Sequence, residues 1–406
     1  MKIAGIVAEY NPFHSGHAHH IQRTRDPDGG CRATHIAVVM SGSFVQRGEP
    51  ALLPKAERVR MALAGGADLV LELPLPWSMA SAEGFAFGAV AILDALGCVD
   101  TISFGSECGD AAALQKAAAL LESPRFGQLL RYRLEDGISF PEARQKAVAD
   151  IAGQKIAALF SRPNNTLGIE YLKALTRLGS AMQPFTIPRF GAEHDEMQPL
   201  GDVASASYIR RLAAAGRLLN AAPFLPPACY AILSEAAQAG RCPAAVSRLE
   251  RGLLARFREM AAADWRQVPG VSEGLENRLT EAARQAGGWE DLLERIKTRR
   301  YPLTRLQRLL WAAFLGIPVG LEKERPPYAR ILGLNAKGEE ILAAVKEAAL
   351  PDAIPLVSRP GRIDTLGEAA KQVWQLENRA ADLYALTLPQ PYPCGAEYTT
   401  GVIRTE

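Results

Sequence analysis

The first twenty residues constrain the fold of this chain more than any other stretch, and residues 2–20 read KIAGIVAEYNPFHSGHAHH. Residues 3–8 are apolar and partly β-branched, and they are too few for a helix core, so they predict a buried parallel strand. Asn11 and Pro12 break the strand, and the following residues predict a helix that begins near His14. This order indicates a nucleotide site, because a helix start offers unpaired N–H groups and a positive dipole end to phosphate.

Three residues of this stretch have suitable chemistry. Gly16 has no Cβ, so a ribose or an adenine can approach the backbone there. His14 and His17 are three residues apart on one face of the first helical turn, where both can hydrogen-bond a phosphoryl group in its transition state. A histidine cluster is also typical of metal sites and of plain helix surfaces, and His19 is expected to face solvent. We favour no metal site, because the chain has no CxxC and no second histidine pair.

Two short motifs occur in the order found in one superfamily. Residues 14–17, HSGH, match the HxGH signature of class I synthetases and nucleotidyltransferases, in its expected place after the first strand. Residues 205–210, SASYIR, resemble the SxxxIR phosphate-binding motif of the same superfamily. There Ser207 is expected to cap a helix and Arg210 to face the leaving pyrophosphate. An ordinary capped helix has the same short pattern.

The rest of the first half alternates strand and helix patterns. Further strands are predicted at 35–40, 68–73, 100–104 and 185–190, and helices at 55–65 and 81–96. Alternation with short turns predicts a doubly wound, Rossmann-like parallel sheet with the nucleotide at the carboxyl ends of its strands. Residues 111–160 lose the strand pattern and predict a helical insert.

Several residues near these strand ends are candidate ligand contacts. Arg47 is a candidate for an anion or RNA, or is a solvated loop arginine. Gly105 leaves room for adenine or ribose beside the chain, and Arg189 can pair with phosphate in a fork geometry. Asn164 and Asn165 have donors and acceptors suited to a nucleotide, but they are equally typical of a helix N-cap.

The length of 406 residues allows two or three domains. We predict a catalytic domain over 1–215 and a mainly helical, basic region over 216–406 that includes a small α/β element beyond residue 326. In that element, strands at 329–334 and 353–357 flank a helix at 337–349, and the tail after residue 389 is expected to lie on the surface. The net charge of +2 gives no general attraction to nucleic acid, so RNA contacts require a local patch.

A basic run at residues 295–308, RIKTRRYPLTRLQR, is the candidate patch. Basic residues with interleaved aromatics, here Tyr301 and Trp311, suit a phosphate backbone and unstacked bases. A solvated helix face would have the same charge pattern. The candidate tRNA contacts are Arg47, Lys297, Arg299, Arg300, Arg305 and Arg308.

The cysteines and the apolar stretches indicate the compartment. The six cysteines are scattered without a framework spacing, which is typical of reduced thiols in the cytoplasm. The N-terminal apolar run is too short for a signal peptide, and no uncharged stretch is long enough for a membrane span. We therefore expect a cytoplasmic protein without membrane contact.

The chain as a whole resembles the bacterial tRNA(Met) cytidine acetate ligase family. The matching blocks are GIVAEYNPFHSGHAHH, MSGSFVQRGEPA, ADLVLELP, SAEGFAFGAV, SFGSE, NNTLGIEYLKAL, SASYIR and KTRRYPLTRLQR, in that order. Ser15 and Ala18 replace the more usual residues of the family. The resemblance implies an enzyme that activates acetate with ATP as an acetyl-adenylate and acetylates N4 of the wobble cytidine of elongator tRNA(Met). Mg²⁺ is expected to accompany ATP.

The resemblance also assigns site residues, with His14 and His17 as the catalytic pair. It places ATP contacts at Val7, Ala8, Glu9, Tyr10, Asn11, Pro12, Phe13, His14, Ser15, Gly16, His17, Ala18, His19, His20, Gly105, Arg189 and one of Asn164 and Asn165, of which we choose Asn165. The second motif adds Ser207 and Arg210. Two alternatives remain open. A small-molecule adenylyltransferase could use the same core, and a non-catalytic RNA-binding protein could have kept the fold.

Overall fold

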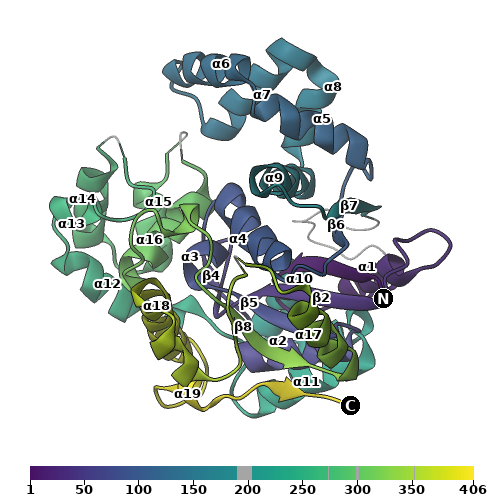
Figure 1. The fold of residues 1–406 in the computed structure, drawn as a ribbon. Coiled ribbons are helices and arrows are strands. Elements are labelled where there is room, and N and C mark those ends of the chain that lie inside the picture. The colour runs from purple at the N-terminus through teal and green to yellow at the C-terminus, as the bar shows by residue number, and fades with distance from the viewer. Residues whose placement is uncertain (190–203, 273, 299–300, 352) are drawn as a thin grey trace.

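A mostly parallel sheet forms the centre of the computed structural model, which describes residues 1–189, 204–272, 274–298, 301–351 and 353–406 (Figure 1). Its strand order is β10-β8-β5-β2-β1-β6-β7, with β9 beside β8. Pairings from β5 across to β7 are parallel, and β8 runs antiparallel to β5. The strands of this sheet are β1 (Ile3–Ala8), β2 (His35–Ser41), β5 (Leu69–Leu73), β6 (Thr101–Ser106), β7 (Gln183–Pro188), β8 (Ala329–Leu334), β9 (Leu356–Val357) and β10 (Ile403–Arg404).

Helices cover both faces of the sheet, which explains why β1, β2 and β5 consist mostly of apolar residues. Their bounds are α1 (Ser15–Arg25), α2 (Lys55–Ala64), α3 (Leu75–Ser78), α4 (Ala82–Ala95), α9 (Pro163–Leu178), α10 (Ala206–Ala214), α11 (Pro227–Gln238), α17 (Ala336–Ala348), α18 (Glu368–Ala385) and α19 (Ala396–Thr399). Residues of α1, α2, α10 and α11 share one core cluster, and residues of α4, α9, α17 and α18 share the cluster on the other face. The predicted doubly wound α/β fold is therefore confirmed.

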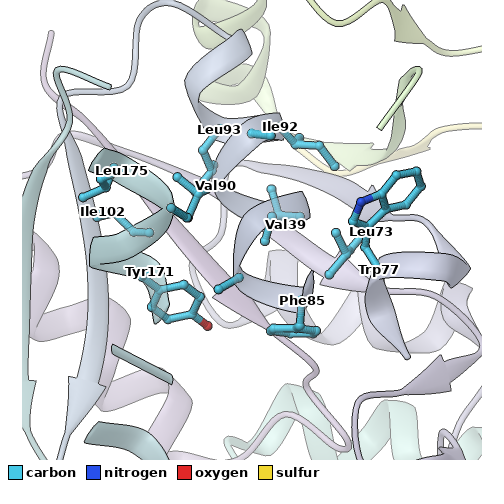
Figure 2. Close-up of a cluster of buried hydrophobic side chains, with 14 of the residues drawn as sticks. Val39, Leu73, Trp77, Phe85, Val90, Ile92, Leu93, Ile102, Tyr171 and Leu175 are labelled. Carbon is cyan, nitrogen blue, oxygen red and sulfur yellow. The ribbon is translucent and has the colours of Figure 1, made fainter. Parts of the chain in front are cut away.

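Helix α4 is apolar almost all round, as expected of a buried helix. It begins at Ser81, whose hydroxyl accepts a hydrogen bond from the backbone N–H of Gly84. Figure 2 shows its Val90 and Leu93 beside Ile102 of β6 and Leu175 of α9. This packing holds α9 against the sheet.

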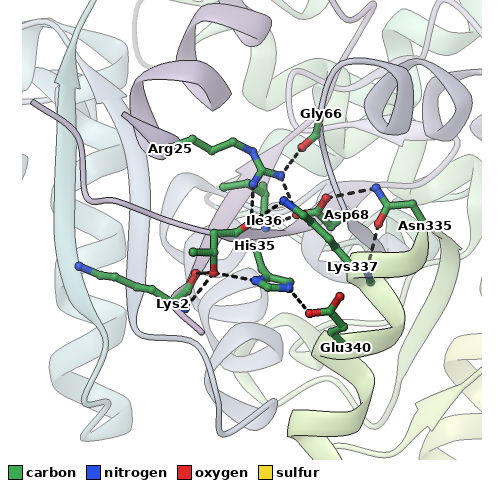
Figure 3. Close-up of polar contacts among 11 residues, drawn as sticks. Lys2, Arg25, His35, Ile36, Gly66, Asp68, Asn335, Lys337 and Glu340 are labelled. Carbon is green, nitrogen blue, oxygen red and sulfur yellow. Dashed lines mark hydrogen bonds and ion pairs between the residues drawn. The ribbon is translucent and has the colours of Figure 1, made fainter. Parts of the chain in front are cut away.

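The C-terminal α/β element is continuous with the central sheet, because β8 pairs with β5. Asp68, just before β5, connects this element to the N-terminal part of the sheet by hydrogen bonds (Figure 3). One carboxylate oxygen of Asp68 accepts from the Arg25 guanidinium at 2.6 Å and from the backbone N–H of Ile36 at 2.7 Å. The other oxygen accepts from the side chain of Asn335 at 3.1 Å. The N-terminal and C-terminal parts of the chain therefore share one sheet.

The tail was expected to lie on the surface, and for Glu397 this prediction is wrong. Glu397 is 6% exposed, and its carboxylate pairs with Lys55, at 2.9 Å, and with Arg330. Lys55 also pairs with Glu72 and lies 3.7 Å from Glu377. These five residues, hereafter the buried ion cluster, tie the tail to α2, β5, β8 and α18.

Two helical groups flank the sheet (Figure 1). Residues 111–160 are helical as predicted, in α5 (Ala111–Leu121), α6 (Pro124–Glu135), α7 (Phe140–Ala152) and α8 (Gln154–Ala157). The second group consists of α12 (Glu250–Glu259), α13 (Ala262–Trp265), α14 (Leu275–Gln285), α15 (Trp289–Ile296) and α16 (Leu303–Leu315). Its core includes Trp311. A short hairpin, formed by β3 (Phe44–Val45) and β4 (Glu49–Pro50), packs against this core. The ring centres of Phe44 and Trp311 are 4.8 Å apart.

Candidate active site

The two histidines form the start of α1. His14 is the N-cap, and its Nδ1 accepts a hydrogen bond from the backbone N–H of Gly16 at 3.0 Å. Nδ1 of His17 accepts from the backbone N–H of His14 at 3.2 Å, which completes a capping box. Because Nδ1 is the acceptor in both rings, a neutral ring carries its proton on Nε2. The local hydrogen bonds thus select the tautomer in which Nε2–H is a donor.

The two imidazoles also stack, with ring centres 3.9 Å apart. The Tyr10 ring lies edge-on to the His17 ring, with their centres 4.9 Å apart, and its centre is 4.8 Å from that of Phe13. Tyr10 and Phe13 are both buried. Tyr10 has a φ of +45°, in the left-handed region, so the chain turns sharply between β1 and α1. The turn brings both histidines over the carboxyl end of β1.

A cavity of about 260 Å³ lies at this position. Its wall includes many of the predicted ATP contacts, namely Val7, Ala8, Glu9, Tyr10, Asn11, His14, Gly16, His17, His19, His20, Gly105, Arg189 and Arg210. It also includes Arg47, which was predicted as an anion or RNA contact. The cavity crosses the carboxyl ends of β1 and β6, where a nucleotide is expected in a doubly wound sheet.

Other predicted ATP contacts are absent from the residues that line the cavity. They are Pro12, Phe13, Ser15, Ala18, Asn165 and Ser207. Phe13 is fully buried, and a Cβ on Gly65 would lie 2.1 Å from its ring. Phe13 therefore anchors the turn in the core on the α2 side of the sheet.

Arg210 is held at the cavity by three polar groups. Its guanidinium donates to the backbone carbonyl of Asn11 at 3.0 Å and to the Ser207 hydroxyl at 3.3 Å, and it pairs with Glu49 at 2.9 Å. Ser207 was expected to cap α10, but Ser205 is the cap, because its hydroxyl accepts from the backbone N–H of Tyr208. Ser207 instead orients Arg210.

The structure distinguishes the adjacent asparagines. Asn164 lines the cavity and accepts a hydrogen bond from the Arg189 guanidinium at 3.1 Å. Asn165 is 2% exposed, and its side-chain oxygen accepts from the backbone N–H of Cys108 at 3.0 Å. The Glu107 carboxylate accepts from the backbone N–H groups of both asparagines and occupies the start of α9. Asn164 is thus the better placed of the two to contact a nucleotide.

His20 is bound to the sheet. Its Nε2 lies 3.0 Å from the Ser103 hydroxyl, which in turn lies 2.7 Å from the Thr24 hydroxyl. Burial, together with the neighbouring Arg189 and His19, lowers the pKa of His20 to about 4. His20 is therefore neutral at physiological pH, and its ring is bound to β6, whereas the rings of His14 and His17 bond the start of α1.

The hairpin between β3 and β4 forms another part of the wall. Glu9 accepts a hydrogen bond from the backbone N–H of Gln46 at 2.8 Å, and burial raises the pKa of the Glu9 carboxyl. On its other side the hairpin touches α16, where the Arg308 guanidinium donates to the Gln46 carbonyl at 3.2 Å. A Cβ on Gly48, whose φ is +75°, would lie 2.5 Å from the backbone nitrogen of Arg308. The basic region thus contacts the hairpin of the site directly.

The described part of the basic run differs from the sequence interpretation in its aromatics. Tyr301 and Trp311 are buried, so they pack the helical core and cannot stack on bases. Lys297 is exposed, whereas Arg305 lies 4.6 Å above the Tyr301 ring and donates to a backbone carbonyl. Arg299 and Arg300 lie outside the described residues.

The sequence patterns did not identify the apolar part of the wall. It consists of Ile6, Phe85, Phe104, Leu167, Tyr171 and Ile187. Their pattern is that of ordinary core positions, so only their position at the cavity distinguishes them. Among the described residues, no group of three or more His, Cys, Asp or Glu side chains is arranged to hold a metal ion. None of the described helices is both long and apolar enough to cross a membrane.

The fold and this site define a class, the HIGH nucleotidyltransferases: a family model described as HIGH Nucleotidyl Transferase matches residues 1–397. Two proteins named tRNA(Met) cytidine acetate ligase are each 39% identical to this chain. The protein from Acetivibrio thermocellus aligns over 99% of this chain and 100% of its own length, and that from Syntrophotalea carbinolica over 96% and 95%.

Solved structures agree. Thermotoga maritima TmcAL without ligand has a TM-score of 0.94, with 32% identity and full coverage of both chains. The same protein bound with alpha-thio ATP has a TM-score of 0.92 over the same coverage. The chain belongs to the tRNA(Met) cytidine acetate ligase family, a family of ligases built on the HIGH nucleotidyltransferase fold.

Proposed function

We propose that this protein activates acetate with ATP as an acetyl-adenylate and transfers the acetyl group to N4 of the wobble cytidine of elongator tRNA(Met). The observation that carries the proposal is the stacked pair His14 and His17 at the start of α1, on the wall of the cavity. The names of the relatives support the substrates, and the alpha-thio ATP in the Thermotoga maritima protein supports ATP.

The residues suit an in-line attack of a carboxylate on the α-phosphate. Two Nε2–H donors and the N–H groups at the start of α1 stabilise the charge that develops on phosphorus-bound oxygen. Arg210, which is positioned by Asn11 and Glu49, is the group that we expect to bind the leaving pyrophosphate. On the same wall, Gly105 and Asn164 suit the adenosine part of ATP, and Arg189 suits a phosphate group. Mg²⁺, as the expected companion of ATP, would neutralise part of the phosphate charge, in addition to the charge stabilisation by the start of α1 and Arg210.

The defining test is the transfer of labelled acetyl from acetate to total tRNA by the purified protein with ATP and Mg²⁺. We expect label on the wobble cytidine of elongator tRNA(Met). Pyrophosphate release with a phosphorylated metabolite but never with acetate would instead indicate a small-molecule adenylyltransferase. Salt-dependent tRNA binding that is indifferent to ATP, without label transfer, would indicate a non-catalytic RNA-binding protein.

Gly16→Ala is expected to lower the rate of acetyl-adenylate formation by about 100-fold, since small misplacements of catalytic groups have effects of this size. The new Cβ would lie 2.8 Å from Cε1 of His14, so the imidazole must move from the position that its cap hydrogen bond fixes. Single-turnover kinetics measure the effect. The control is Gly127→Ala in α6, where a Cβ meets nothing within 4 Å; an equal loss in this control would contradict the explanation.

Lys297→Ala is expected to weaken tRNA binding and to reduce the slope of log K against log salt by about 1 if Lys297 contacts a phosphate. Lys297 is exposed at the end of α15, in the group of helices that contacts the hairpin of the site. Filter binding at several salt concentrations measures the slope. Lys346→Ala, which changes an exposed lysine of α17, is the control and should leave the slope unchanged.

A further inference from the structure

The cavity has two sides that belong to opposite faces of the sheet. On β6, Ser103 faces α1 and hydrogen-bonds His20, whereas the Phe104 ring lies 5.6 Å from Tyr171 of α9. On β1, Val7 packs with the core cluster of α4 and α9. Val7 is the only predicted ATP contact on this second side, so the groups assigned to ATP account for little of it. It is formed by Val7, Phe85, Phe104, Leu167 and Tyr171, hereafter the apolar lobe.

Tyr171 is the polar exception in the apolar lobe. It is 3% exposed, and its hydroxyl has no hydrogen-bond partner among the described residues, although it lies on the cavity wall. Figure 2 shows its phenol extending from α9 on the side of Phe85. Burial raises the pKa of the Tyr171 phenol, so the hydroxyl is a donor at neutral pH. The hydroxyl opens onto the cavity, so a ligand that fills this part of the cavity can accept its hydrogen bond.

We propose that the apolar lobe is the subsite for the carboxylic acid substrate, with the Tyr171 hydroxyl donating to the carboxylate and the alkyl group packed against Phe85 and Val7. This inference rests on the proposed function, since it locates the acid that the ATP site activates. In this placement the carboxylate lies between the apolar lobe and the histidines, so its second oxygen can face the α-phosphate. The raised pKa of Glu9, which lies on the same wall, lessens repulsion between two carboxyl groups.

The same placement predicts selection by size. Phe85 and Phe104 are 2% and 5% exposed, so their rings are packed on most sides, and we expect the apolar lobe to admit a short chain only. Each added methylene must displace a packed ring, and a hydrophobic pocket discriminates by about 10- to 200-fold per methylene. Acetate should therefore be preferred over propionate, and propionate over butyrate.

The experiment measures AMP release by the purified protein with ATP, Mg²⁺ and unmodified tRNA while acetate is varied. We expect Tyr171→Phe to raise the KM for acetate by about 10- to 100-fold, because a hydrogen bond to a charged group is lost, and to leave the KM for ATP unchanged. We expect Phe85→Ala to improve the use of butyrate relative to acetate by about 10-fold. Tyr132→Phe, at a tyrosine of α6 that is 59% exposed, is the matched control.

Each outcome decides the proposal. An unchanged KM for acetate in Tyr171→Phe would overturn it and would leave the proposed function intact, as long as the wild-type protein acetylates tRNA. A rise in the KM for tRNA alone would also overturn it and would assign the apolar lobe to the cytosine ring. If the wild-type protein binds ATP but releases no AMP with acetate, the proposed function itself fails and the subsite fails with it.

Discussion

His17→Ala is expected to lower the single-turnover rate of acetyl-adenylate formation by about 100- to 1,000-fold, the typical effect of removing one donor that stabilises developing charge. The hydrogen bond that His17 is proposed to donate to the phosphoryl group strengthens in the transition state. The affinity for ATP should therefore change far less than the rate. The variant also loses the capping hydrogen bond that the His17 ring accepts from the backbone N–H of His14 at 3.2 Å. The loss of this cap should lower the unfolding free energy by about 1 kcal/mol.

The measurement is quenched-flow formation of the adenylate, with ATP affinity determined separately. Gln22→Ala is the matched control, because Gln22 lies on the same helix, is exposed and is not on the cavity wall. We expect that variant to stay within about threefold of the wild-type rate, since surface changes have small effects. Acetylation of tRNA at the wild-type rate by His17→Ala would show that the histidines of this motif are not the catalytic pair.

Lys55→Ala is expected to have the largest effect on stability, about 3–5 kcal/mol of unfolding free energy. Lys55 is 9% exposed and pairs with Glu72 and, at 2.9 Å, with Glu397. Its removal leaves buried carboxylates with one cation, Arg330, in place of two. An uncompensated buried charge is far more costly than a lost pair at the surface.

Urea unfolding followed by circular dichroism measures this free energy. Lys371→Ala is the control, because Lys371 pairs at 2.9 Å with Glu368, whose side chain is 89% exposed, and the change should cost less than about 1 kcal/mol. The double variant Lys55→Met with Glu72→Gln removes one charge of each sign and should recover part of the loss. An equal unfolding free energy for Lys55→Ala and Lys371→Ala would show that the buried ion cluster does not stabilise the fold.

The contact between the basic region and the β3–β4 hairpin connects the proposed tRNA-binding region with the proposed ATP site. Arg308 is half-buried, and burial, with Arg305 nearby, lowers its pKa to about 10. It remains charged at neutral pH, and its hydrogen bond to Gln46 holds the hairpin that also carries Arg47. Arg308 therefore supports the site from the helical side, in addition to its predicted contact with tRNA.

Sequence patterns alone were sufficient for the features that depend on neighbouring residues. The apolar strand, the break at Asn11 and the helix start at His14 follow from local preferences, and the alternation of strands and helices led to the correct fold class. The histidine motif could be assigned for the same reason, because three-residue spacing on a helix places both rings together without any tertiary contact.

Only the tertiary structure decided the features that depend on distant pairing. Asn164 and Asn165 are equivalent in sequence, and the carboxylate of Glu107 and the packing of α9 place one at the cavity and the other in the core. Glu397 reads as a residue of a surface tail, yet it is buried against Lys55. Tyr171 reads as a core residue of an amphipathic helix, yet it lies on the cavity wall. Local periodicity determines which face of an element is buried, but not which partner lies opposite, since that depends on the order and register of strands far apart in the chain.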